Sequence, residues 1–141
     1  MATTFKFYKN AALTEEFVLG TDFIGPVTSP PDDSLVIWFG STDATKKLQA
    51  AAPGTPGTTP VYVTIEDAAS SSGLEATDVK MADTYAGLAS ATGGADLSLT
   101  ATVLGGVSNA AEIFIEVDFA AGGIASDKNV SLNVLGDEYA V

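Results

Sequence analysis

Residues 112–119 read EIFIEVDF in one-letter code, and their side chains alternate in character with a period of two. The odd positions are all apolar, whereas the even positions hold three carboxylates and Phe114. Successive side chains of a β-strand point to opposite faces, so this alternation predicts a strand with one buried face. The stretch therefore favours an all-β fold.

The same pattern recurs along the chain. In residues 96–103, Leu97, Leu99, Ala101 and Val103 share one face, and the other face is polar. Residues 35–39 are apolar at every position, which is typical of a central strand covered on both faces, or of one whose outer face meets a partner. Shorter copies of the pattern predict strands over residues 5–8, 61–66, 79–81 and 130–135, and residues 15–19 are a further candidate.

Helix signals are few in this sequence. Residues 41–52 offer Ser41 as an N-cap, an acidic first turn and a stop at Pro53, so they predict one short helix. Residues 84–91 could form another turn of helix. The segment 53–60, PGTPGTTP, predicts a loop because Pro removes backbone donors and Gly adds backbone freedom.

Closely spaced short strands predict an all-β fold, an antiparallel two-sheet β-sandwich of immunoglobulin-like or jelly-roll type, with at most one or two short helices. A closed barrel is the structural alternative, since it also needs one apolar and one polar face per strand. The length of 141 residues favours a single domain over residues 1–141.

The composition argues against catalysis and against several kinds of partner. The chain has no His, Cys or Arg, which are a common proton shuttle, a strong nucleophile and a planar anion ligand. Its formal net charge is -12, and its six lysines are scattered. We therefore expect no nucleic-acid partner and no anionic membrane partner.

No motif in the sequence supplies a catalytic, cofactor or metal site. The adjacent carboxylate pairs are Asp32-Asp33, Glu66-Asp67 and Asp137-Glu138, and neighbours in a strand point to opposite faces. The run Asp127-Lys128-Asn129 lacks the glycine and terminal glutamate of a calcium loop. We therefore expect no enzyme activity, no cofactor and no metal.

Aromatic side chains are the candidates for contact with a partner. Phe114 stands on the acidic face of its strand, so either that face is covered locally or Phe114 meets a partner. Trp38 and Tyr62 lie in predicted strands and could stack on a sugar ring or belong to the core. Phe5, near the start of the chain, completes the set of candidate interface residues.

Six short motifs resemble a pattern in small virion structural proteins of tailed bacteriophages. They are FGS at residues 39–41, KKLQA at 46–50, VKMA at 79–82, GLASATGG at 87–94, LSL at 97–99 and GGVSNA at 105–110. The opening FKFYKNAALT, residues 5–14, is also similar to the start of such proteins. The resemblance implies a structural component of a phage particle without an active site.

Among such proteins, a decoration or cement protein that binds and stabilises the capsid exterior suits the small size and the β-rich pattern. The expected partners are the major capsid protein or other virion proteins, together with further copies of this chain in a homo-oligomer. The expected location is the virion, assembled in the host cytoplasm, because the first residues contain no signal peptide. A tail or baseplate component and a carbohydrate-binding adhesion module are the alternatives.

Overall fold

The structure is a computed structural model that describes residues 4–17, 34–67, 77, 79–117 and 130–141. Within these residues the chain forms short β-strands and two short 3-10 helices, and it contains no helix that is long and apolar enough to cross a membrane. The strands are β1 (Lys6–Tyr8), β2 (Ser34–Gly40), β3 (Lys46–Ala50), β4 (Tyr62–Asp67), β5 (Val79–Ala82), β6 (Leu97–Ser98), β7 (Thr102–Leu104), β8 (Ala111–Val117), β9 (Val130–Val134) and β10 (Gly136–Ala140). The helices are η2 (Ala86–Ser90) and η3 (Val107–Asn109).

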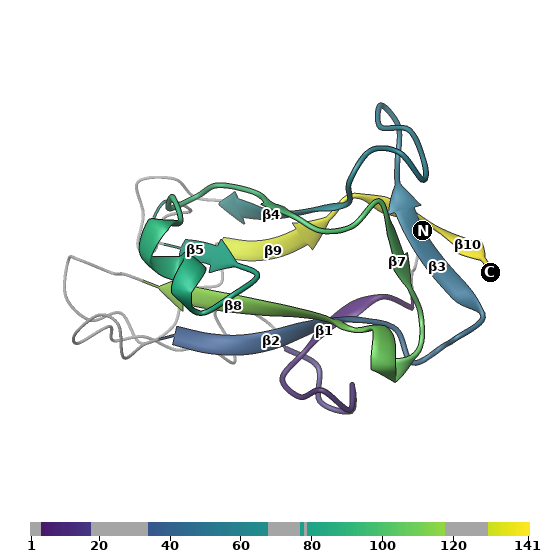
Figure 1. Ribbon diagram of the computed structural model, residues 1–141, viewed down its shortest axis with the longest axis horizontal. Helices are drawn as coiled ribbons and strands as arrows, with labels where there is room; N and C mark the ends of the chain where they lie inside the picture. The colour runs from purple at the N-terminus through teal and green to yellow at the C-terminus, as the bar shows by residue number, and fades with distance from the viewer. Residues whose placement is uncertain (1–3, 18–33, 68–76, 78, 118–129) are drawn as a thin grey trace.

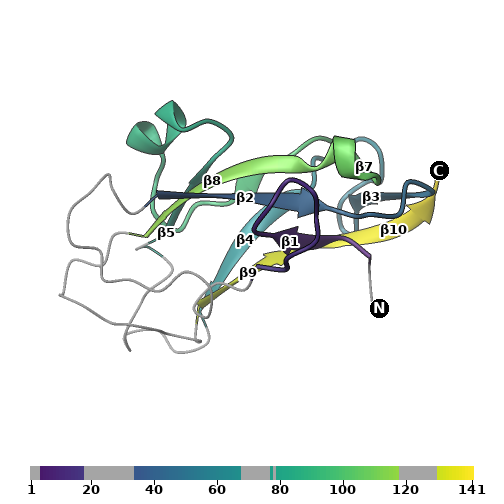
Figure 2. The same ribbon diagram turned by 90° about the horizontal axis from the view of Figure 1, so that it is seen from below.

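The strands form three antiparallel sheets. One has four strands in the order β1-β2-β8-β5, and the other two have three strands each, β10-β3-β7 and β6-β4-β9. In Figure 1, β4 and β9 lie above β2 and β8, while β3, β7 and β10 lie together at the right-hand end. Figure 2 shows the same layers from below.

The two three-stranded sheets are continuous through the backbone. Strand β6 leads into β7, β9 leads into β10, and β3 leads through the loop of residues 53–60 into β4. The linked strands take corresponding places in the two sheets: β3 and β4 are central, β10 and β9 flank them as one pair, and β7 and β6 as the other. Three neighbouring runs of chain therefore pass together from one sheet into the other. Strands that bend from one sheet into another form the corners of sandwich-like folds.

One apolar core is shared by all three sheets. Its most buried side chains are each at most 2% exposed and come from four strands: Ile37 and Phe39 of β2, Leu48 of β3, Val63 of β4 and Ile113 of β8. Phe39 packs between aromatic neighbours, because its ring centroid lies 4.9 Å from that of Phe7 and 6.0 Å from that of Phe5. The all-β, antiparallel, sandwich-like fold predicted from the alternation is confirmed.

The helix predicted over residues 41–52 is wrong. Residues Lys46–Ala50 form β3, the central strand of its sheet, paired with β10 and β7. Leu48 and Ala50 alternate inward there and are buried, so tertiary packing overrides the local helix signals. The turn of helix predicted over residues 84–91 is present as η2.

The strand predicted over residues 96–103 is divided into β6 and β7. Between them, Leu99 donates from its backbone N–H to the Val61 carbonyl at 2.7 Å, and Val61 donates in return to Thr100 at 3.1 Å. The chain then leaves β4 and pairs with β3, so one alternating stretch serves two sheets. Of the candidate strand at residues 15–19, Glu16 forms an isolated bridge to Tyr8, and residues 18 and 19 lie outside the described part.

Candidate binding surfaces

Phe114 and Trp38 lie on the outer face of the four-stranded sheet. Trp38 is half-buried and lies across the strands from Tyr8 and Glu112. Phe114 is also half-buried, and the ring of Tyr85 packs edge-on against it with a centroid separation of 6.2 Å. Tyr85, the residue that precedes η2, therefore covers part of Phe114 from within the same chain.

Phe5 does not lie at an exposed surface. Its side chain is 3% exposed and belongs to the shared core, where it packs against Phe39. Phe5 and Phe7 point inward because they share one face of the first strand, whereas Lys6 between them is exposed. The assignment of Phe5 to a partner interface is therefore corrected: the residue stabilises the fold.

Tyr62 lies on the outer face of β4. It is 41% exposed, while its neighbours Val61 and Val63 are fully buried on the opposite face. Its ring borders a hollow of about 260 Å³ that also contacts Pro60, Asp96 and Leu135. Tyr62 is thus the sequence-predicted aromatic residue that is most open to a ligand.

The carboxylates singled out in the sequence lie on different strands or outside the described residues. Within the described residues no group of three or more Asp or Glu side chains could hold a metal ion. Glu66 accepts a hydrogen bond from the Asn133 amide at 3.2 Å. Asp137 and Glu138 lie on opposite faces of β10, while Asp32-Asp33 and Asp127-Lys128-Asn129 fall outside the described residues.

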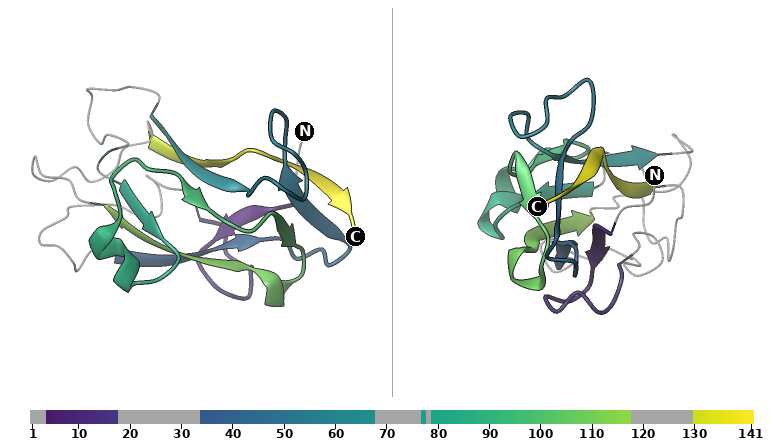
Figure 3. Two further views of the ribbon diagram at one scale, coloured as in Figure 1. Left: turned by 45° about the horizontal axis from the view of Figure 1, so that its top comes forward. Right: turned by 90° about the vertical axis from the view of Figure 1, so that its right-hand side faces the viewer.

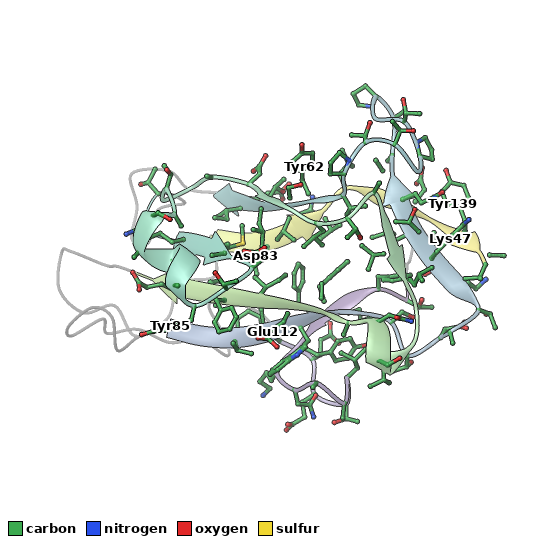
Figure 4. All side chains as sticks on the ribbon, in the orientation of Figure 1. Lys47, Tyr62, Asp83, Tyr85, Glu112 and Tyr139 are labelled. Carbon is green, nitrogen blue, oxygen red and sulfur yellow. The ribbon has the colours of Figure 1, made fainter. Side chains whose placement is uncertain are left out.

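The outer face of the β10-β3-β7 sheet carries a partly exposed row of an aromatic, a cationic and an aliphatic side chain. Tyr139 pairs with Lys47, and Lys47 pairs with Leu104, so the three side chains stand side by side across the sheet. Tyr139 is 38% and Leu104 is 45% exposed. Figure 4 shows Tyr139 and Lys47 close together on β10 and β3, and the right-hand view of Figure 3 looks onto this end of the molecule.

The neighbouring row of the same face is mostly uncharged. It contains Asp137, Gln49 and Thr102 in register, and the Gln49 amide donates to the Thr102 hydroxyl at 2.8 Å. Among the residues that the structure describes, Lys47 forms no ion pair. Lys47 and Asp137 cancel each other in formal charge, so this face is close to neutral on a chain of net charge -12. We call these two rows the neutral face.

A partly buried hydrogen-bond network holds the neutral face to the four-stranded sheet. Glu138, which points inward from β10, accepts from both the backbone N–H and the hydroxyl of Thr4, each at 2.7 Å. The Ser41 hydroxyl donates to the Thr4 hydroxyl at 2.7 Å and accepts from the Asp43 N–H at 3.1 Å. The network therefore joins β10, the residue before Phe5, and the connection between β2 and β3.

Asp43 continues this network at the surface. Its carboxylate accepts from the Thr45 hydroxyl at 2.5 Å and from the Thr45 N–H at 2.9 Å. These two hydrogen bonds favour the charged form and lower the pKa of Asp43 below its ordinary value of 3.8, with a further contribution from the positive charge of Lys46. Asp43 therefore orders the turn before β3.

Two larger hollows open along the sides of the sandwich. One, of about 310 Å³, lies between β1 and β9 and is lined largely by core side chains such as Phe7, Phe17 and Val134. The other, of about 530 Å³, runs from β6 and β7 to β8 and is lined by hydroxyls with Asp83 and Glu112. Figure 4 labels both of these carboxylates. Neither hollow contains an aromatic side chain that is strongly exposed.

The neutral face was not predicted from the sequence. Its central strand was predicted as part of a helix, and β10 was not predicted at all. The alternation of Leu48 and Ala50 was an available signal for β3, although it covers too few residues to outweigh the capping pattern.

Comparisons of the chain with protein families, with curated proteins and with solved structures find no match.

Proposed function

We propose that this chain is a non-enzymatic structural protein of a phage virion, a decoration or cement protein that binds the capsid exterior through its neutral face. The observation that carries the proposal is the row in which the half-buried Lys47 stands between the exposed Tyr139 and Leu104, with no acidic neighbour in the same row. The sequence resemblance to small virion proteins supports the choice of a capsid as the partner.

Charge explains why the neutral face is the docking side. Copies of a chain with net charge -12 repel one another when they crowd onto a shell, so the acidic surfaces are best placed in solvent. The neutral face can be buried against a protein surface without removing a cluster of carboxylates from water. Tyr139 supplies a large, rigid contact, and Lys47 supplies a cation for an acceptor on the partner.

Repetition makes modest contacts sufficient. A shell presents the same site many times, so each copy needs only a small apolar contact and a few hydrogen bonds. If the chain is also a homo-oligomer, several neutral faces engage the shell at once, and the effective concentration raises the apparent affinity.

Cryo-electron microscopy of virions that contain the protein tests the location. We expect density for the chain at regular positions on the outer surface of the capsid, with β3, β7 and β10 facing the shell. Density confined to the tail or baseplate would replace the capsid assignment by the tail alternative. Absence of the chain from purified virions would reject a virion role.

Co-sedimentation with empty capsids tests the docking face. We expect Tyr139→Ser to weaken binding about tenfold, which corresponds to about 1.4 kcal/mol. Tyr85→Ser is the matched control, because Tyr85 is a more exposed tyrosine at a different surface. Equal loss in both variants, or none in Tyr139→Ser, would contradict docking through the neutral face.

A further inference from the structure

The hollow beside Tyr62 is built where the β3–β4 run is interrupted. Five segments line it: the end of β3 at Ala50, the loop of residues 53–60, the outer face of β4, the residue Asp96 before β6, and Leu135 between β9 and β10. Its volume is about 260 Å³, slightly below the range of most small-molecule pockets. In Figure 4, Tyr62 stands near this loop and away from Tyr85.

The walls of the hollow are largely apolar and open to solvent. Tyr62 is 41% and Leu135 is 58% exposed, and Pro53 and Pro60 contribute further apolar surface. Large apolar side chains that stay exposed beside a concave surface mark a site of contact. An aromatic ring at such a place offers a flat face to a ligand with a flat apolar side.

The polar groups of the hollow offer both donors and acceptors. The Thr59 hydroxyl accepts from the Thr55 N–H at 2.9 Å, so its own proton remains to be donated. The Thr64 hydroxyl donates to the Asn133 carbonyl at 3.3 Å, so its lone pairs remain to accept. The carboxylate of Asp96, at the rim, is a stronger acceptor than either hydroxyl.

The loop wall is held by its own hydrogen bonds. The Thr58 and Thr59 N–H groups both donate to the Thr55 carbonyl, at 3.1 and 2.9 Å, and the Thr59 hydroxyl completes the turn. A wall that is ordered before binding reduces the entropy lost on association. The hollow is therefore prepared for a ligand of fixed shape.

We infer that the Tyr62 hollow binds one ring of a neutral saccharide. A pyranose ring has an apolar C–H side that stacks on an aromatic ring, and hydroxyls at its rim that each donate and accept a hydrogen bond. Tyr62 meets the first requirement, and Thr59, Thr64 and Asp96 meet the second. The carboxylate of Asp96 and the net charge of -12 disfavour anionic sugars.

The hollow shares no residue with the neutral face, although Gly57 of its loop lies beside the Gln49 side chain, so it adds an adhesive function to a structural one. Trp38, the other aromatic residue predicted for sugar contact, is half-buried between cross-strand neighbours and lines none of the hollows described above.

An NMR titration of the full ¹⁵N-labelled chain with neutral trisaccharides of glucose, galactose, mannose and N-acetylglucosamine, each at up to about 10 mM, tests the inference. We expect a single small site to supply about 4 kcal/mol of binding free energy, which corresponds to a Kd of about 1 mM. We expect at least one trisaccharide to shift the amide resonances of Tyr62, Asp96 and Leu135. We expect Tyr62→Ala to weaken that binding about tenfold and Tyr85→Ala to change it less than about twofold.

Three outcomes would overturn the saccharide site. They are no shift with any of the four sugars, shifts that are centred away from the hollow, and shifts that survive in Tyr62→Ala. Binding of a proline-rich peptide at the same residues, without any sugar binding, would assign the hollow to a protein partner instead. Tyr139→Ser should leave the sugar titration unchanged, so failure of this inference and failure of capsid docking are distinguishable.

Discussion

Replacing Ser41 by Ala tests how the neutral face is attached to the rest of the fold. Ser41 is fully buried, and its hydroxyl makes two hydrogen bonds, one donated to Thr4 and one accepted from Asp43. The variant leaves the Asp43 N–H without this acceptor in a partly buried position. Thr4 is less affected, because its own hydroxyl still donates to Glu138 at 2.7 Å.

The expected cost follows from the unsatisfied donor. A buried donor that loses its partner costs about 1–3 kcal/mol, so we expect Ser41→Ala to lower the free energy of unfolding by about 2 kcal/mol. That is a substantial part of the roughly 5–15 kcal/mol that stabilises a typical domain. With a urea m-value of about 2 kcal/mol per molar, the midpoint of unfolding should fall by about 1 M.

Urea unfolding followed by the fluorescence of Trp38, the sole tryptophan of the chain, measures this shift. Ser108→Ala is the matched control, because Ser108 is an exposed serine in η3, and we expect it to change the stability by less than about 0.5 kcal/mol. Thr4→Val combined with Ser41→Ala should cost less than the sum of the two single changes, because the residues share one network. An unchanged midpoint in Ser41→Ala would refute the network as a source of stability.

Three further predictions concern other parts of the fold. Gly105→Ala should lower the free energy of unfolding by about 2 kcal/mol or more in the same urea assay, because the added Cβ would lie 2.0 Å from the Asp43 carbonyl oxygen. A change below about 0.5 kcal/mol would contradict this packing. Thr45→Val should raise the pKa of Asp43 towards its ordinary value in a carboxyl NMR titration. Because the pKa of Asp43 is depressed in the unaltered chain, the stability due to Asp43 should be present above pH 3.8 and lost as the pH falls through the lowered pKa. An unaltered Asp43 titration would show that Thr45 is not the cause. Tyr85→Ala should expose more of Phe114 and so increase the binding of a hydrophobic dye. Dye binding equal to that of the unaltered chain would contradict this role of Tyr85.

The apolar pattern of the sequence was sufficient to predict β2 and β8, the two interior strands of the four-stranded sheet. The sequence of β8 places Ile113 and Ile115 inward, and both are fully buried. The apolar run at residues 35–39 corresponds to the interior strand β2, with Ile37 and Phe39 in the core and Trp38 half-buried on the other face. These strands could be predicted because their burial pattern is local and repeats over several residues.

The C-terminal strand could not be predicted in this way. Its inward residue opposite Leu48 is Glu138, a side chain that a local pattern assigns to solvent. Glu138 is half-buried, and its carboxylate accepts two solvent-exposed hydrogen bonds from Thr4, 134 residues earlier in the chain. A partner so distant in the sequence leaves no periodic signal, so β10 and the face it completes emerge only in the folded chain.

Exposure alone does not identify the binding residues among the aromatic side chains. Tyr62, Tyr85 and Tyr139 are all substantially exposed, yet their neighbours differ. Tyr85 packs against Phe114 of its own chain and so has an intramolecular role. Tyr139 stands in a row with a cation and an apolar side chain, which suits a flat protein surface, whereas Tyr62 borders a concave site with hydroxyl and carboxylate groups, which suits a small ring. We therefore base the proposed partner of each ring on its immediate surroundings and not on its accessible area.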